Sequence, residues 1–179
     1  GDNAASAELA TEAIEIARDL GAPEIEANAL ITRSGSRLAL GAMDEAEADA
    51  RRANELAAGI GNTAELPRSL RYLAEVLAFR RQHDKAISTS VRAFDEAERL
   101  GLGRSEGISA LAALAAEMLW AGRWREADGV LRRMERVGVS GYHANSFHLV
   151  HAHLAIGRGD FAGAERHIAA LDRLATDDV

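Results

Sequence analysis

The sequence contains no cysteine, only two prolines and few aromatic residues. Without a thiol, the chain has no disulfide framework, no thiolate nucleophile and no sulfur-ligated zinc site. Hydrophobic residues make up 47% of the chain but aromatic residues only 4%, so the apolar content is largely alanine and leucine, which favour closely packed helices. Pro23 and Pro67 each follow a turn signal and fit the first position of a helix, where a missing N–H costs nothing. The composition therefore favours an all-helical chain.

The chain also lacks a net positive charge, because the formal net charge is −7 and the pI is about 5.4. Binding to the phosphate backbone of a nucleic acid requires a broad cationic surface, so we expect no direct nucleic-acid binding. No apolar run approaches membrane-spanning length, and residues 1–4 lack the basic and apolar regions of a signal peptide. We therefore expect a cytoplasmic protein that does not contact membranes.

Sequence motifs of the common enzyme classes are missing as well. No Gly-x-x-x-x-Gly-Lys-Ser/Thr phosphate-binding loop occurs, and Gly101-Leu102-Gly103 lacks both the spacing and the preceding strand of a dinucleotide fingerprint. There is no His-Glu-x-x-His pair and no nucleophile elbow. The sequence therefore predicts a protein that is not an enzyme and that holds no cofactor.

What the sequence does contain is a repeat. A degenerate copy opens the chain, and related phrases begin at Gly41 (GAMDEAEADARRA), Arg81 (RQHDKAISTSVRA), Gly122 (GRWREADGVLRRM) and Gly159 (GDFAGAERHIAAL). Within them a small residue recurs with spacings of 40, 40, 41 and 37 residues, at Ser6, Ala46, Ala86, Ala127 and Ala164. A period of this length indicates stacked structural units rather than one compact domain.

Each period contains two segments with apolar residues at i, i+3, i+4 and i+7, separated by short glycine-containing turns. No segment shows the alternation that strands require. The unit is therefore a helical hairpin, and we expect an all-α chain with about nine helices. We expect a single repeat domain over 1–179, with a lone second helix at 3–20 and hairpins at approximately 23–60, 67–100, 106–137 and 141–175.

Both terminal helices keep an apolar stripe, with Leu9 and Ile16 in the first and Ile168 and Leu171 in the last. A repeat array covers its outer apolar faces with polar capping helices or leaves them to a neighbour. We therefore expect either a fragment of a larger protein or an array that forms a homodimer through a terminal helix.

The pattern inside the unit resembles the tetratricopeptide repeat (TPR). In that family, large and small residues of the first helix pack against small residues of the second, and the third unit matches with Leu70, Leu73, Ala74 and Leu77 facing Ala86. Small residues suit these places because helix axes approach to about 8–10 Å only where the crossing side chains are short. The resemblance implies a right-handed α-solenoid of antiparallel helical hairpins with a concave binding surface.

The second unit departs from this pattern, because Arg33, Ser34 and Arg37 stand where apolar residues are expected. The period near forty residues is similar to the long-helix TPR variety in the C-terminal arrays of MalT-like, LuxR-type ATPase transcriptional regulators. Phrases such as GRWREADGVLRRM carry this narrower resemblance. It implies a signal-transduction module that binds a protein segment, a peptide or a small effector.

The resemblance also places a set of side chains toward the concave groove. The main candidates for ligand binding are Arg68, Arg71, Tyr72, Glu75, Phe79, Trp120 and His153. The same register turns six further residues toward the groove: Asn28, Ile31, Gly35, Ala112, Ala116 and Leu119. Arg68 and Arg71 are three residues apart, so together they can grip a carboxylate or phosphate, since guanidinium groups bind such anions bidentately. The alternative is that both are ordinary solvated arginines of an arginine-rich chain.

Four histidines gather in the segment that forms the last first helix, at His143, His148, His151 and His153. His148 and His151 are spaced i, i+3 on one helix face, which is a spacing that can hold two metal ligands. No third ligand is placed beside them, so the sequence predicts no metal site and leaves these two as weak candidates. Packing or surface histidines, or a pH-sensitive contact, are the alternatives.

Three functions remain open from the sequence. The first is a non-catalytic binding module that serves as the sensor or coupling arm of a transcriptional regulator. The second is a self-association scaffold of another signalling protein, which the apolar terminal helices favour. The third is a helical metal- or anion-dependent enzyme with a site built from the histidines and the Arg68 and Arg71 pair.

Overall fold

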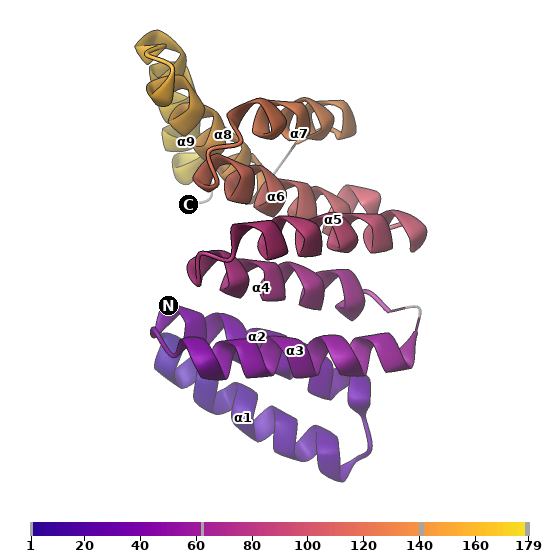
Figure 1. Ribbon diagram of the computed structural model, residues 1–179. Coiled ribbons are helices and arrows are strands. Elements are labelled where there is room, and N and C mark those ends of the chain that lie inside the picture. Colours follow the sequence, from indigo (N-terminus) through magenta and orange to yellow (C-terminus); the bar gives the residue numbers. More distant parts are fainter. Residues whose placement is uncertain (1, 62, 140–141, 178–179) are drawn as a thin grey trace.

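The computed structural model describes residues 2–61, 63–139 and 142–177. In these residues the chain forms nine α-helices and no strand (Figure 1). The helices are α1 (Asn3–Asp19), α2 (Pro23–Ala39), α3 (Met43–Ile60), α4 (Glu65–Phe79), α5 (His83–Arg99), α6 (Ile108–Trp120), α7 (Trp124–Val137), α8 (Tyr142–Gly157) and α9 (Phe161–Asp177), with a π-helical turn, η1 (Gly103–Gly107), leading into α6. The predicted all-α fold is confirmed.

Local sequence explains where the helices begin and turn. The Asp2 side chain caps α1 by accepting hydrogen bonds from the backbone N–H groups of Ala4 and Ala5, and Pro23 occupies the first position of α2. Gly122 closes the α6–α7 turn with φ of 74°, a backbone conformation that glycine adopts freely. Arg81 holds the matching position of the α4–α5 turn with φ of 59°, so this hairpin closes at a cost in backbone strain.

The small residues of the repeat lie where helices cross. Ala46, Ala86 and Ala127, from α3, α5 and α7, are fully buried, and Ala164 of α9 is nearly so. Each of these second helices packs against the first helix of its own hairpin. Short side chains at these crossings let the paired helices approach closely, which is the reason for the recurrence in the sequence.

The hairpins stack in chain order from α1 to α7, as Figure 1 shows. First helices also pack on the next first helix, in the pairs α2–α4, α4–α6 and α6–α8. The last hairpin is inclined to the layers below it, since α8 packs mainly on α6 and α9 and only slightly on α7 (Figure 1). The largest apolar core lies among α4 to α8 and includes Leu70, Leu111 and Leu131. Among the described residues, no helix has the length and apolarity needed to cross a membrane.

Candidate functional site

A groove crosses the first helices α2, α4, α6 and α8, and we call it the first-helix groove. Apart from Asn3 of α1 and Glu106 of η1, every described residue of its lining belongs to one of these four helices. Because the first helices of successive units lie side by side, their exposed faces form one continuous surface. The side chains that give the groove its chemistry are Arg68, Arg71, Tyr72, Glu75, Phe79, Glu117, Trp120 and His143.

The cationic part of the groove lies in the first two turns of α4, with Arg68 and Arg71. The Arg71 guanidinium stacks over the Tyr72 ring, 4.3 Å from its centroid, and the Arg71 Nε is buried without a hydrogen-bond partner. The Tyr72 ring reaches this place because Gly35 of α2 has no side chain, since a Cβ there would lie 2.9 Å from the Tyr72 Cε1 atom. Both arginines therefore face the groove, and their grip on an anion stays a prediction.

Two carboxyl groups lie deeper in the first-helix groove. Glu117 of α6 is only 4% exposed, and its Oε1 accepts a hydrogen bond of 3.0 Å from the hydroxyl of Ser90. Burial raises the pKa of Glu117 to about 7, and the charge of Glu75 adds to this rise while the Ser90 hydrogen bond opposes it. Burial also raises the pKa of Glu75, against the opposing effect of the Arg71 charge.

Two exposed aromatic side chains stand one turn further along the same helices. Phe79 of α4 is 60% exposed and Trp120 of α6 is 64% exposed. Trp120 also meets His153 of α8 edge-on, with the ring centroids 5.4 Å apart. His153 itself is not part of the groove lining, and its Nδ1 lies 2.9 Å from the carbonyl oxygen of Leu149. Six of the seven main sequence candidates thus share one groove, and the seventh, His153, contacts the groove residue Trp120.

The predicted register is wrong for two of the other residues. Ile31 and Leu119 were expected to face the groove, but both side chains are buried in apolar clusters. Successive residues are rotated by about 100° around the helix axis, so an error of one position moves a side chain from the surface into the core. Asn28 is exposed to a different hollow, described below.

The histidines divide between two places. His143 lines the first-helix groove, whereas His148 and His151 turn to α9 and meet His167, which sequence reasoning missed. The Nδ1 atoms of His148 and His167 are 2.9 Å apart, and the His151 and His167 rings stack with centroids 4.6 Å apart. Burial lowers the pKa of all three, so they are held near the neutral form. In the part of the chain that the structure describes, no group of three or more ligands is arranged to hold a metal ion.

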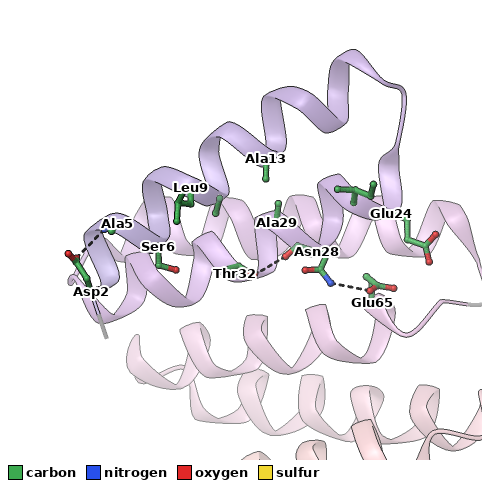
Figure 2. A pocket seen from close by; sticks show the side chains of 12 residues that line it. Asp2, Ala5, Ser6, Leu9, Ala13, Glu24, Asn28, Ala29, Thr32 and Glu65 are labelled. Atoms are coloured by element: carbon green, nitrogen blue, oxygen red, sulfur yellow. Dashed lines mark hydrogen bonds between the residues drawn. The ribbon is translucent and has the colours of Figure 1, made fainter.

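A second hollow lies between α1 and α2, near the first-helix groove (Figure 2). Its apolar wall comes from Leu9 and Ala13 of α1 and from Ile25 and Ala29 of α2. Leu9 and Ile25 are exposed, although both are large apolar residues. On the polar side, the Asn28 amide donates a hydrogen bond of 3.4 Å to Glu65 Oε1 of α4, which Figure 2 shows as a dashed line.

Sequence reasoning also missed Glu117 as a groove residue. A signal was present, because Glu117 is the only charged residue in the thirteen-residue helix α6, whose other residues are almost all apolar. A lone carboxylate in such a helix is costly to bury, which makes it a candidate for function.

Comparisons with solved structures place this architecture in a known class. The chain is similar to BtubC (BKLC) from P. vanneervenii, with a TM-score of 0.77, 17% identity and coverage of 99% of this chain and 74% of that one. It is also similar to two crystal structures of the nearly identical TPR-like repeats of a Podosopora anserina protein described as a kinesin light chain. The first, of a variant of those repeats, has a TM-score of 0.66 with 12% identity, over 97% of this chain and 94% of that one. The second has a TM-score of 0.63, also with 12% identity, over 97% and 95%.

These likenesses show a TPR-like helical repeat fold. No family model matches the chain, and no curated protein sequence matches it either. At 12–17% identity the likeness concerns the fold alone. The function therefore has to be argued from the chemistry of the groove.

Proposed function

We propose that this chain is a non-catalytic binding module whose first-helix groove takes an extended protein segment or peptide. One observation carries the proposal: the groove crosses four consecutive first helices and presents Phe79 and Trp120 largely exposed. Large aromatic residues dominate the binding energy of many interfaces because they bury much apolar area at little entropic cost. A long groove with mixed charge suits an extended segment better than a single small molecule, although a small effector is the alternative ligand.

Peptide selection tests this proposal. Peptides are selected from a random display library on the whole chain, and their affinities are then measured for two variants. Trp120→Ala is expected to weaken binding by about tenfold or more, because it removes an exposed aromatic contact. Phe161→Ala is the matched control, because Phe161 is 66% exposed but lies outside the groove. If no peptide is enriched, or if both variants bind like the wild type, the groove is not the binding site.

We further propose that the module is the sensor or coupling arm of a LuxR/MalT-type transcriptional regulator in the bacterial cytoplasm. The support is the period near forty residues and the resemblance of phrases such as GRWREADGVLRRM to those arrays. A groove that takes a segment or effector suits such an arm. The sequence of the full-length gene tests it: an ATPase domain and a helix-turn-helix elsewhere in the protein are expected, and the absence of both would overturn it.

Self-association through α1 is a second candidate function. Four apolar residues at this end are all more than half exposed: Leu9 and Ile16 of α1, Leu20 directly after α1, and Ile25 of α2. Within the array each first helix packs against its own second helix and the next first helix, and the α1–α2 hollow offers the same two kinds of surface. A helix from a second copy of the chain fits this arrangement, because its apolar face would cover the exposed side chains.

Molecular mass as a function of concentration tests the self-association. Sedimentation equilibrium of the wild type is expected to show dimers that dissociate on dilution, and Leu9→Asp is expected to shift the equilibrium to monomer. Val91→Asp is the control, since Val91 is an exposed apolar residue of α5 in the middle of the array. A wild-type mass that stays monomeric at high concentration would eliminate this candidate.

A further inference from the structure

Glu117 carries a hydrogen-bonding atom that the fold leaves unused. Its Oε1 accepts from Ser90, but its Oε2 is buried and has no hydrogen-bond partner. The side chain is 4% exposed and belongs to the lining of the first-helix groove. A buried acceptor without a donor is costly, and for a carboxylate the cost is larger. The wall of the groove therefore contains an acceptor atom, Glu117 Oε2, that lacks a donor and that a donor from a bound ligand would satisfy.

Glu75 adds a second carboxyl group to the same part of the groove. Glu75 and Glu117 both line this groove, and the charge of Glu75 adds to the rise that burial causes in the pKa of Glu117. The charge of Arg71 on α4 acts on Glu75, but the Arg71 guanidinium is stacked on the Tyr72 ring. Two carboxylates that repel each other in a poorly solvated place form a site that a positive charge would stabilise.

The exposed aromatic residues set the shape of the ligand. Phe79 follows Glu75 by four residues on α4, and Trp120 follows Glu117 by three residues on α6. Four residues of helix span about 6 Å, a distance that the aliphatic stem of lysine or arginine covers. Aromatic faces accept such stems and also attract cations. Carboxylates at one level and aromatic rings at the next therefore match a side chain with an apolar stem and a cationic end.

We propose that the first-helix groove receives a lysine or arginine side chain of its partner segment, with the cationic head at Glu75 and Glu117 and the stem against Phe79 and Trp120. This inference rests on the proposed peptide-binding function and names the chemistry of its central contact. The net charge of −7 agrees with a basic partner, since complementary charge speeds encounter and fixes register. Arg68 and Arg71 lie toward the start of α4, so an acidic residue elsewhere in the same segment can still reach them.

Defined peptide mixtures test the proposal on the whole chain. Three mixtures of acetylated, amidated octapeptides carry lysine, glutamine or glutamate at one central position, and only uncharged residues vary elsewhere. Binding is measured by isothermal titration calorimetry. The lysine mixture is expected to bind about tenfold more tightly than the glutamine mixture, since a hydrogen bond to a charged group contributes at least that much. The glutamate mixture is expected to bind most weakly.

Two glutamate substitutions assign the preference to the carboxyl pair. In the variant with both Glu75→Gln and Glu117→Gln, the lysine and glutamine mixtures are expected to bind equally, while Glu12→Gln on the exposed face of α1 keeps the preference. Circular dichroism melts confirm that each variant is folded. A second readout is proton release: near pH 6.5 part of Glu117 is protonated, so a bound cation expels a proton, which calorimetry in two buffers detects. The double variant is expected to lose this release.

The outcomes separate the inference from the proposed function. If the lysine and glutamine mixtures bind equally and Trp120→Ala weakens both, the groove binds peptides but the cation site is wrong. If the lysine preference survives in the double variant, the cation binds elsewhere and the inference is overturned. If spermidine binds as tightly as the lysine mixture and releases the same proton, the ligand is a free amine and not a peptide. If no mixture binds, the inference and the peptide-binding function both fall.

Discussion

The α2–α3 and α6–α7 hairpins have the same backbone arrangement but different interiors. Between α2 and α3, Asp49 is almost buried and forms ion pairs with Arg33 at 2.8 Å and Arg37 at 2.5 Å. The Ser34 hydroxyl beside them donates a hydrogen bond of 2.8 Å to the carbonyl oxygen of Ala46. Between α6 and α7, the contacts belong to the large apolar core. The α2–α3 hairpin therefore adds directional polar bonds to its buried apolar residues, whereas the α6–α7 hairpin relies on apolar packing.

The two solutions respond differently to damage. A buried ion pair adds little net stability, because desolvation offsets the attraction between the charges, but removal of one partner leaves an unpaired charge in the interior. Truncation of a buried apolar side chain loses transfer free energy and leaves a cavity, but it leaves no unpaired charge in the interior. We therefore expect that the stability lost by replacing Asp49 between α2 and α3 is recovered when its two arginine partners are replaced as well. A truncated apolar side chain between α6 and α7 has no such partners to replace.

The largest effect is expected for Asp49→Ala. This change strands the Arg33 and Arg37 guanidinium groups at the helix interface, so the free energy of unfolding is expected to fall by about 3–5 kcal/mol. Urea denaturation followed by circular dichroism measures it. The variant that combines Arg33→Met, Arg37→Met and Asp49→Leu is expected to recover most of the loss, because an apolar interior of similar volume replaces the charges.

Leu111→Ala provides the apolar counterpart in α6. Leu111 is 1% exposed, so its truncation is expected to cost about 2–5 kcal/mol through lost burial and a cavity.

If Asp49→Ala instead costs less than about 1 kcal/mol, the ion pairs behave like exposed ones and the two hairpins do not differ in the way the buried contacts imply.

The same contrast explains how far sequence reasoning reached. The hairpin array was predictable because helical periodicity and the buried alanines of the repeat are local signals that recur along the chain. Arg33 and Arg37 looked like departures from the repeat, because their partner Asp49 lies on another helix, and pairing across helices leaves no mark in the local pattern.

The groove was predictable in part for a similar reason. Arg68, Arg71 and Phe79 were assigned to it from the repeat register, whereas Ile31 proved buried because the register does not fix helix rotation to within one residue. Glu117 was missed because its role depends on its burial and on the charge of Glu75, which lies on a different helix. Contacts between helices of different units are set by packing, and no sequence spacing encodes them.

Glu117 is a buried polar residue of α6, the helix that contributes most to the large apolar core. Its replacement therefore tests how that region tolerates a carboxyl group. Its pKa of about 7 lies above the ordinary value of 4.5, so the folded chain holds a proton that the unfolded chain has released between these pH values. The stability due to this group is present in full below pH 4.5 and is lost as pH rises through 7. By this group alone, the unfolding free energy falls by up to about 3 kcal/mol over that range.

Glu117→Gln removes this titration, so the variant is expected to be more stable than the wild type at pH 8 and to lose that advantage at pH 4.5. Urea denaturation at both pH values gives the difference. Glu12→Gln, on the exposed face of α1 and outside the groove, is the control for the exchange of a glutamate for a glutamine. A Glu117→Gln effect that does not depend on pH would show that the carboxyl group is well solvated.

Gly35 of α2 is an exception within the α2–α3 hairpin, because its close contact with Tyr72 is steric and not polar. A Cβ at this position would lie 2.9 Å from the Tyr72 Cε1 atom, so Gly35→Ala must displace the ring that supports Arg71. In the wild-type background the change is expected to be neutral or slightly destabilising, since the contact offsets the gain in helix propensity. In a Tyr72→Ala background the same change is expected to stabilise α2 by about 0.5–1 kcal/mol. A double-mutant cycle by urea denaturation measures the coupling, and equal effects in the two backgrounds would mean that the ring moves away at no cost.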